Sequence, residues 1–285
     1  MIHDGRVCEL GEGALWHPLR RQLFWFDILG KRLHSIEDGV PRSWSFVEMV
    51  SAAGWVSRDV LLIAGERDLF LFDLETEEIE TLAELEADDP DTRSNDGRAD
   101  RQGGFWIGTM GKRGGDDPGR GSIWRWYRGE LRRLYSGLTI PNSICFSPDG
   151  RFAHFSDTLT HRIQRVALDQ DGWPAGNAET FVDLGDEGLL PDGATVDAAG
   201  NLWNAQWGAG RVACYGPDGR FLKAVPMGAG QTSCPAFGGE GLSTLYCTSA
   251  LEGMDAAARA ADPDAGKTFA VPSVGTGLPE PQVMI

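Results

Sequence analysis

Short apolar and aromatic runs recur along this chain at intervals of about 40 to 50 residues. Their starts lie 37, 45, 47, 50 and 43 residues apart, and the runs occupy 23–26, 60–63, 105–108, 152–155, 202–205 and 245–248. No window of a dozen residues keeps an apolar stripe at helical spacing without an interrupting Gly or Pro. The pattern therefore predicts a chain built mainly from short β-strands.

One kind of turn precedes most of these runs. In most of them Pro or Asp begins the turn and Gly supplies a position of positive φ; the turns lie at 17–21, 100–104, 147–151, 197–201 and 238–241. Segments that alternate apolar and polar residues follow some of the runs, at 68–73, 122–126 and 162–166. Such alternation is typical of a second strand with one buried face.

A unit of several short strands repeated about every 45 residues is the signature of a β-propeller, in which each blade is a four-stranded sheet. The six units predict an all-β fold, a six-bladed β-propeller with a central channel. A β-sandwich is the alternative, but sandwiches do not require a turn and a strand repeated in near-constant register. No low-complexity linker divides the chain, so we expect residues 1–285 to form a single domain.

The composition narrows the range of partners. The chain has 285 residues, with 26 Lys and Arg against 42 Asp and Glu, giving a formal charge of −16. Such a surface repels nucleic acid and anionic membranes and attracts cations. No apolar stretch is long enough to span a membrane, and the first residues lack an apolar signal core. We therefore expect a cytoplasmic protein that acts on a small molecule, without nucleic acid, membrane or an obligate protein partner.

Cysteine and histidine give no metal or disulfide pattern. The five cysteines are widely spaced and form no CxxC motif, which predicts buried free thiols: Cys8, Cys145, Cys214, Cys234 and Cys247. The histidines show no ligand spacing and are expected to be structural or solvated: His3, His17, His34, His154 and His161.

Polar residues occupy the same place in four of the six units. Eight positions before the turn Gly, or before Arg20 in the first unit, the chain has Glu12, Asn95, Asn142 and Asp192. The innermost strands of a propeller run in one direction around the channel, so residues at equal offsets form a ring at one end of it. Two carboxylates and two amides in such a ring suit a hard divalent cation. Asn95 could instead face a substrate.

Several short motifs, taken in order, make the chain similar to the gluconolactonase family that includes regucalcin (senescence marker protein) and sugar-acid lactonases. The resemblance extends from Glu12 to about Val271 and rests on the segments 11–16, 93–97, 108–110, 141–143, 155–158 and 191–193. Members of that family are six-bladed propellers with one divalent cation in the channel. The resemblance implies that Glu12, Asn142 and Asp192 bind the metal.

The same resemblance implies that Asp192 also serves as the catalytic base, and that Arg93 and Asn95 bind the substrate. One segment departs from the family pattern. Some animal members have a substrate-contacting acid after the Gly-Thr-Met motif, where this chain has the Gly-rich loop 111–121 with Asp116 and Asp117. The sugar preference of those members therefore cannot be assigned to this chain.

The chemistry that these residues suit is the opening of a sugar-acid lactone of the glucono-, xylono- or galactonolactone type to an aldonic acid. A divalent cation, with Ca²⁺ first and Zn²⁺, Mg²⁺, Mn²⁺ or Fe²⁺ as alternatives, would polarise the carbonyl and activate water. Asp192 would accept the proton of that water. The alternatives are a phosphotriesterase or arylesterase on the same propeller, and a non-catalytic calcium-binding propeller.

Five further expectations concern residues around this site and the two termini. Trp25, Phe105 and Trp203 are expected to pack between blades, and Asp157 to support the channel network. The segment Asp255–Ala261 is predicted to be helical and 266–271 to be a strand. Arg6-Val7-Cys8 is predicted to pair into the last blade and close the ring, which would leave no open sheet edge.

Overall fold

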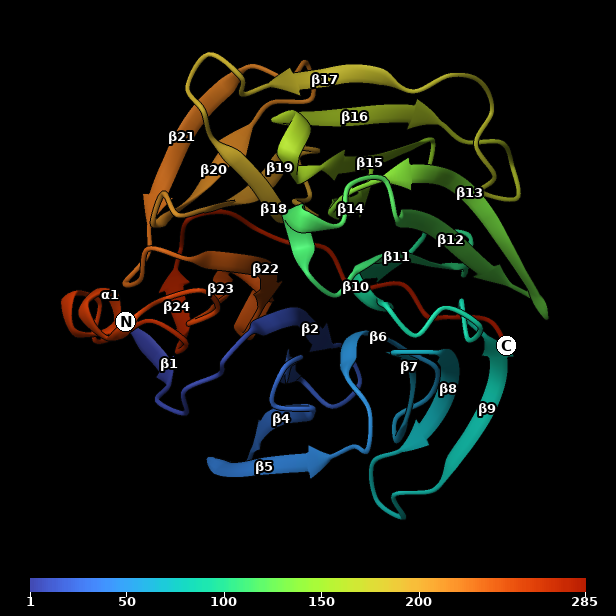
Figure 1. Cartoon of the computed structure of the whole chain (residues 1–285), viewed down its shortest axis with the longest axis horizontal. Helices are drawn as coiled ribbons and strands as arrows, with labels where there is room; N and C mark the ends of the chain where they lie inside the picture. The colour runs from blue at the N-terminus through green and yellow to red at the C-terminus, as the bar shows by residue number, and fades with distance from the viewer.

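The computed structural model describes residues 1–285 and contains six four-stranded antiparallel sheets arranged around a central axis (Figure 1). This is the six-bladed β-propeller predicted from the repeat. The innermost strands are β2 (Gly11–His17), β6 (Val50–Trp55), β10 (Thr92–Ala99), β14 (Pro141–Phe146), β18 (Leu190–Val196) and β22 (Thr232–Gly238). The next strands are β3 (Gln22–Asp27), β7 (Val60–Gly65), β11 (Phe105–Gly111), β15 (Phe152–Asp157), β19 (Leu202–Trp207) and β23 (Thr244–Ser249).

The outer half of each blade is more exposed than the inner half. The third strands are β4 (Arg32–Glu37), β8 (Asp68–Asp73), β12 (Gly121–Tyr127), β16 (Arg162–Ala167), β20 (Arg211–Tyr215) and β24 (Thr268–Pro272). The outermost strands are β5 (Val40–Ser45), β9 (Ile79–Glu84), β13 (Glu130–Leu138), β17 (Glu179–Asp183), β21 (Phe221–Pro226) and β1 (Ile2–Asp4).

The helical elements are short. They are the α-helix α1 (Ala256–Ala261) and the 3-10 helices η1 (Gly114–Asp116), η2 (Thr158–Thr160) and η3 (Glu240–Leu242). No helix has the length and apolar character needed to cross a membrane.

All six predicted apolar runs lie in the second strand of a blade. The preceding turns have the predicted geometry, with φ of 90° at Gly103, 69° at Gly150 and 83° at Gly200. In the first blade the residue of positive φ is Arg21, at 54°, next to the Arg20 used for the alignment. Two turns share a further device, because Asp100 and Asp197 each accept a hydrogen bond from the indole Nε1 of a tryptophan six residues later. The turn thereby fixes the following strand.

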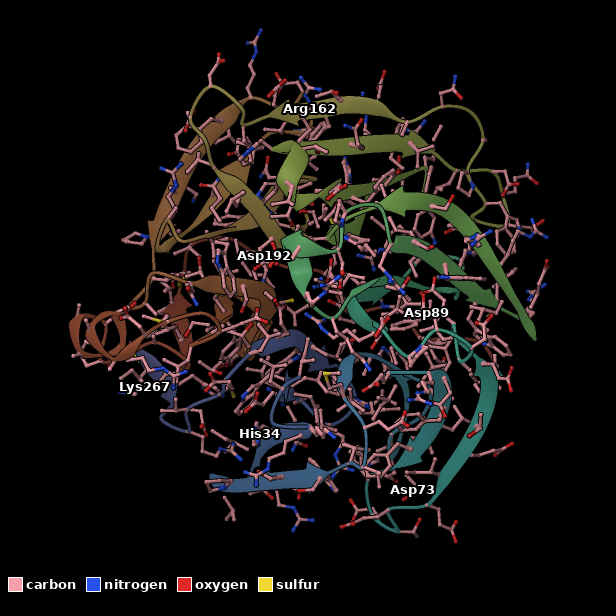
Figure 2. All side chains as sticks on the ribbon, viewed as in Figure 1. His34, Asp73, Asp89, Arg162, Asp192 and Lys267 are labelled. Carbon is pink, nitrogen blue, oxygen red and sulfur yellow. The ribbon has the colours of Figure 1, made fainter.

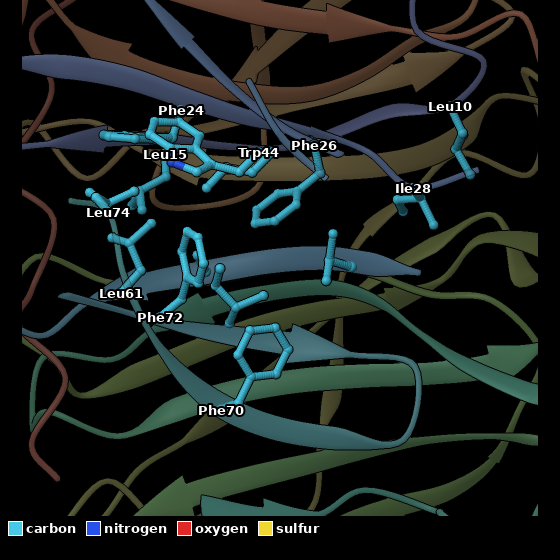
Figure 3. Close-up of a cluster of buried hydrophobic side chains, with 14 of the residues drawn as sticks. Leu10, Leu15, Phe24, Phe26, Ile28, Trp44, Leu61, Phe70, Phe72 and Leu74 are labelled. Carbon is cyan, nitrogen blue, oxygen red and sulfur yellow. The ribbon is translucent and has the colours of Figure 1, made fainter. Parts of the chain in front are cut away.

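The core lies between neighbouring blades. Figure 3 shows the largest cluster, in which Phe24, Phe26 and Trp44 of the first blade face Leu61 and Phe72 of the second. Each buried side chain of this size contributes about 1.5–3 kcal/mol to the stability of the fold, because its apolar surface is removed from water. The predicted packing residues Trp25, Phe105 and Trp203 are at most 1% exposed and belong to other interblade clusters, so they are confirmed as core.

The ring closes one segment earlier than predicted. Strand β1, at Ile2–Asp4, pairs with β24 and completes the sixth blade, whereas Arg6-Val7-Cys8 forms no strand. The Arg6 guanidinium explains this difference, because it binds Asp4 and the carbonyls of Ser35 and Arg42 and so directs the chain toward the first blade. The predicted tail strand begins at Thr268 instead of Gly266, and α1 begins after Asp255, whose carboxylate caps it.

The segment after β24 crosses behind the innermost strands in Figure 1 and ends beside the second and third blades. Its backbone exchanges hydrogen bonds with Ala198, Trp55 and Gly103. Val283 is buried in the cluster between blades two and three, and Glu280 forms a buried ion pair with Arg98. This strap ties together blades that are not neighbours in sequence.

His154 should make the fold sensitive to acid. Burial lowers its pKa from 6.5 to about 3, and its ring packs 4.7 Å from that of Phe181. The unfolded chain binds this proton below about pH 6.5 and the folded chain does not, so stability falls as the pH drops from 6.5 toward 3. We expect this histidine to cost about 2 to 3 kcal/mol of unfolding free energy between pH 7 and pH 4.5.

Urea unfolding at the two pH values measures this effect. His154→Phe keeps a ring beside Phe181 and should reduce the acid-induced loss by about 2 kcal/mol. His161→Gln is the control and should leave the loss unchanged. An equal loss in wild type and His154→Phe would contradict the prediction.

Candidate functional site

A cavity of about 470 Å³ opens at one end of the ring, where the innermost strands begin. All five residues named from the sequence line it, from four different blades, and each is between 4% and 6% exposed: Glu12, Arg93, Asn95, Asn142 and Asp192. Figure 2 shows Asp192 close to the centre of the ring. The four residues at the same position of their blades, Glu12, Asn95, Asn142 and Asp192, thus lie around one cavity, as expected from the repeat.

A bulge in each innermost strand directs these side chains into the cavity. The pairing register shifts between Glu12 and Leu15, between Asn142 and Cys145, and at the corresponding place in the other four blades. A bulge bends a strand and turns a side chain away from the regular alternation. After Glu12 the bulge needs Gly13, with φ of 57°, because a Cβ there would lie 2.2 Å from the carbonyl oxygen of Ser51. After Asn142 the corresponding left-handed residue is Ser143, with φ of 58°.

The backbone at Asp192 is held from two sides. Its carbonyl oxygen accepts hydrogen bonds from Ser143 Oγ at 2.6 Å and from Asn204 Nδ2 at 2.9 Å. Both donors are fully buried. The position of Asp192 is therefore set by the adjacent blade and by its own second strand, independently of its carboxylate.

The two buried carboxylates of the cavity, Glu12 and Asp192, have no cationic partner. Neither Glu12 nor Asp192 forms an ion pair, and the protein donates to Glu12 only through the backbone of Gly13, at 3.4 Å. Burial raises the pKa of both groups well above the usual range, and for Asp192 the negative charge of Glu12 adds to this effect. Buried carboxylates are ordinarily paired or bind a metal. A divalent cation between Glu12 and Asp192 would remove this repulsion, so the donor set fits one.

Of the positively charged residues that line the cavity, Arg93 is the buried one, and only one of its nitrogens is engaged. Its Nη1 donates to Asn95 Oδ1 at 2.8 Å and to the carbonyl oxygen of Ser94 at 2.9 Å, leaving Nε and Nη2 without a protein acceptor. Burial lowers its pKa. The Asn95 amide donates in turn to Asn142 Oδ1 at 3.1 Å. These contacts make Arg93 a donor toward any ligand in the cavity.

Several cavity residues were not found from the sequence. They are Lys112, Arg113, Thr158, Trp207 and Glu252, among others. Lys112 pairs with Glu66, and Arg113 pairs with Asp117. The loop 111–121, which departs from the family pattern, thus contributes residues 112–115 to the cavity wall. Asp117 of this loop does not line the cavity and instead forms the ion pair with Arg113. Lys112 could have been found from its place in the sequence, because it lies just after the Gly108-Thr109-Met110 motif that was already associated with the site.

Asp157 has the supporting role expected of it. Its carboxylate accepts hydrogen bonds from the backbone N–H groups of Thr139 at 2.9 Å and Ile140 at 3.0 Å, in the connection that leads to Asn142. Asp27 does the same in the first blade for Glu9 and Leu10, before Glu12. An aspartate at the end of the second strand therefore fixes the entry to the innermost strand in both blades.

The prediction of buried free thiols is confirmed, and one histidine has surroundings that the sequence did not indicate. All five cysteines are buried and unpaired. His34, however, lies with Cys8 and Asp27 in a buried group whose potential ligand atoms are within 4.8 Å of one another, which the spacing did not predict. Both carboxylate oxygens of Asp27 already accept backbone hydrogen bonds, so this group is a structural junction beside the first blade.

The chain is similar to several proteins that are named as lactonases. The chain is 38% identical to L-arabinolactonase of Azospirillum brasilense, over 94% of this chain and 90% of that one. It is 34% identical to 6-deoxy-6-sulfogluconolactonase of Pseudomonas putida, over 95% and 94% of the two chains. A crystal structure of regucalcin from Agrobacterium tumefaciens, described as a calcium-binding protein, superimposes with a TM-score of 0.97 at 40% identity and covers 100% of this chain and 97% of that one. The SMP-30/gluconolactonase/LRE-like family model matches residues 10–251, and the chain belongs to this family.

Proposed function

We propose that this protein is a divalent-metal-dependent lactonase that opens small sugar-acid lactones to aldonic acids. The observation that carries the proposal is the pair of buried carboxylates, Glu12 and Asp192, that share a cavity with the Asn142 amide and have no cationic partner. The names of the relatives support the substrate class, since they include an arabinolactonase and a sulfogluconolactonase.

Glu12, Asn142 and Asp192 would hold the cation. When bound, the cation supplies a Lewis acid for the lactone carbonyl and lowers the pKa of water. Two carboxylates and one amide oxygen favour Ca²⁺, with Mg²⁺, Mn²⁺, Zn²⁺ and Fe²⁺ as alternatives that the same oxygen set can accept.

Asp192 accepts the proton of the attacking water, and Arg93 binds the substrate. The free Nε and Nη2 of Arg93 donate to the lactone carbonyl or to ring hydroxyls, where the planar guanidinium can make two parallel hydrogen bonds. The low exposure of these groups strengthens each electrostatic contact, because little water competes for them.

Asn95 belongs to the substrate side of the site. Its Oδ1 accepts a hydrogen bond from the Arg93 guanidinium, whose positive charge disfavours a cation at the same oxygen. Both amide hydrogens of Asn95 are given to the Pro141 carbonyl oxygen and to Asn142 Oδ1, so Asn95 holds the guanidinium in place and the free nitrogens of Arg93 donate to a substrate hydroxyl.

The test is the rate of acid release from freshly prepared gluconolactone and xylonolactone, corrected for spontaneous hydrolysis. We expect the chelated protein to be inactive and one divalent cation to restore the rate. The same cation should stabilise the fold by about 3 kcal/mol at 100 times its Kd, because it binds only the folded chain. A chelated protein with full activity would contradict metal dependence.

The same measurement separates the alternatives. A protein that binds the cation, accelerates neither lactone and cleaves paraoxon or phenyl acetate would be a phosphotriesterase or arylesterase. One that binds the cation and cleaves none of these compounds would be a calcium-binding propeller.

A further inference from the structure

The amide of Asn142 can serve a cation only with its oxygen turned toward the cavity. The two ends of a carboxamide have opposite character: Oδ1 is an acceptor and a ligand, whereas Nδ2 is a donor that repels a cation. The two orientations have nearly the same shape, so the surrounding hydrogen bonds must select one. The residues that select it determine whether the site has three oxygen ligands or two.

A directional chain of hydrogen bonds makes this selection. Arg93 Nη1 donates to Asn95 Oδ1 at 2.8 Å, and Asn95 Nδ2 donates to Asn142 Oδ1 at 3.1 Å. Asn142 Nδ2 donates to Thr158 Oγ1 at 2.9 Å, and Thr158 Oγ1 donates to the carbonyl oxygen of Pro191 at 2.8 Å. The chain crosses from β10 through β14 to β18, the strands that carry four of the five predicted site residues.

The two ends of this chain fix its direction. A guanidinium can only donate and a carbonyl oxygen can only accept. Thr158 has a single hydroxyl hydrogen, which it gives to Pro191, so toward Asn142 it can only accept. Asn142 must therefore present Nδ2 to Thr158, and its Oδ1 is directed toward the side of Asn95 and the cavity.

Thr158 is itself rigidly held. It is 6% exposed and begins η2, directly after Asp157. Its backbone N–H donates to the carbonyl oxygen of Ile140 at 3.0 Å, two residues before Asn142. The hydroxyl group is thus fixed relative to both the amide that it orients and the residue that precedes Asp192.

We infer that Thr158 is a positioning residue of the cation site, which orients the Asn142 amide so that Oδ1 is the ligand atom. The inference rests on the proposed function, because it requires a cation held by Glu12, Asn142 and Asp192. Thr158 touches neither cation nor reacting atoms in this role and acts through Asn142. Outer partners of this kind typically change metal affinity by 10- to 100-fold.

The test is calorimetric titration of chelator-stripped full-length protein with Ca²⁺, Mn²⁺ and Zn²⁺ separately. Thr158→Val removes the hydroxyl at constant shape and should weaken binding about 10- to 100-fold. Thr158→Ser keeps the hydroxyl and should restore most of the affinity. Thr160→Val is the matched control, because Thr160 lies in the same short helix but donates only to the exposed carbonyl of Asp157.

The outcomes separate this inference from the proposed function. Wild-type affinity in Thr158→Val, with the cation bound by both proteins, would overturn the role of Thr158 and leave the proposed function standing. Wild type that binds none of the three cations would overturn both. If Thr158→Val is insoluble, Thr158→Ala is titrated in its place, and equal weakening in Thr160→Val would also overturn the inference, because the effect would then come from the helix.

Discussion

Asp192→Asn should lower kcat/KM for lactone opening by about a thousandfold while the protein stays folded. Loss of a positioned general base costs 10²- to 10⁴-fold, and the substitution also removes one of the two negative charges that would hold the cation. The backbone should not move, since Ser143 and Asn204 hold the Asp192 carbonyl whatever its side chain. Steady-state kinetics on gluconolactone measures the effect.

The same variant should be at least as stable as wild type in chelator. The pKa of Asp192 is raised by burial and by Glu12, so its charge is unfavourable in the metal-free fold and its removal relieves that repulsion. Asp218→Asn, in an exposed turn, is the control and should keep full activity. An Asp192→Asn protein that retains activity would exclude Asp192 as the base, whereas one that unfolds would show that the carboxylate is structural.

The propeller could be predicted because its repeat depends on local chemistry. The turns at Asp100 and Asp197 carry the same Asp, Gly and Trp at the same spacing, and the structure shows that one hydrogen bond joins the Asp to the Trp in both. The offset that identified Glu12, Asn142 and Asp192 succeeded for a related reason. Eight positions separate the site residue at the bulge from the aligned turn position in each of these blades. The bulge itself was not predicted.

The remaining features depend on contacts between residues far apart in the chain. Arg6 donates to residues 29 and 36 positions away, so no local sequence pattern could indicate its effect on the N-terminal strand. Lys112 and Glu252 line the same cavity from opposite parts of the sequence. The strap after β24 has no strand periodicity, because its backbone hydrogen bonds go to scattered residues in four different blades.

Asp100→Ala should destabilise the fold by about 3 to 5 kcal/mol, and Arg125→Met should cost clearly less. The two side chains form a fully buried ion pair, with Arg125 Nε 2.6 Å from Asp100 Oδ2. Without Asp100, the guanidinium keeps the carbonyl of Asp171 and the rings of Tyr127 and Trp173, at 4.4 and 4.3 Å, but no negative partner. An uncompensated buried cation is costly.

Without Arg125, the carboxylate of Asp100 still accepts hydrogen bonds from the backbone of Gln102 and Gly104 and from Trp106 Nε1. That difference in remaining partners is why the two halves of one ion pair should cost different amounts. Asp197→Ala provides the matched control, because Asp197 has the same turn and tryptophan contacts without a cationic partner. Urea unfolding of the three variants should rank Asp100→Ala as the most destabilised; equal losses in Asp100→Ala and Asp197→Ala would mean that the turn, and not the buried charge, determines the cost.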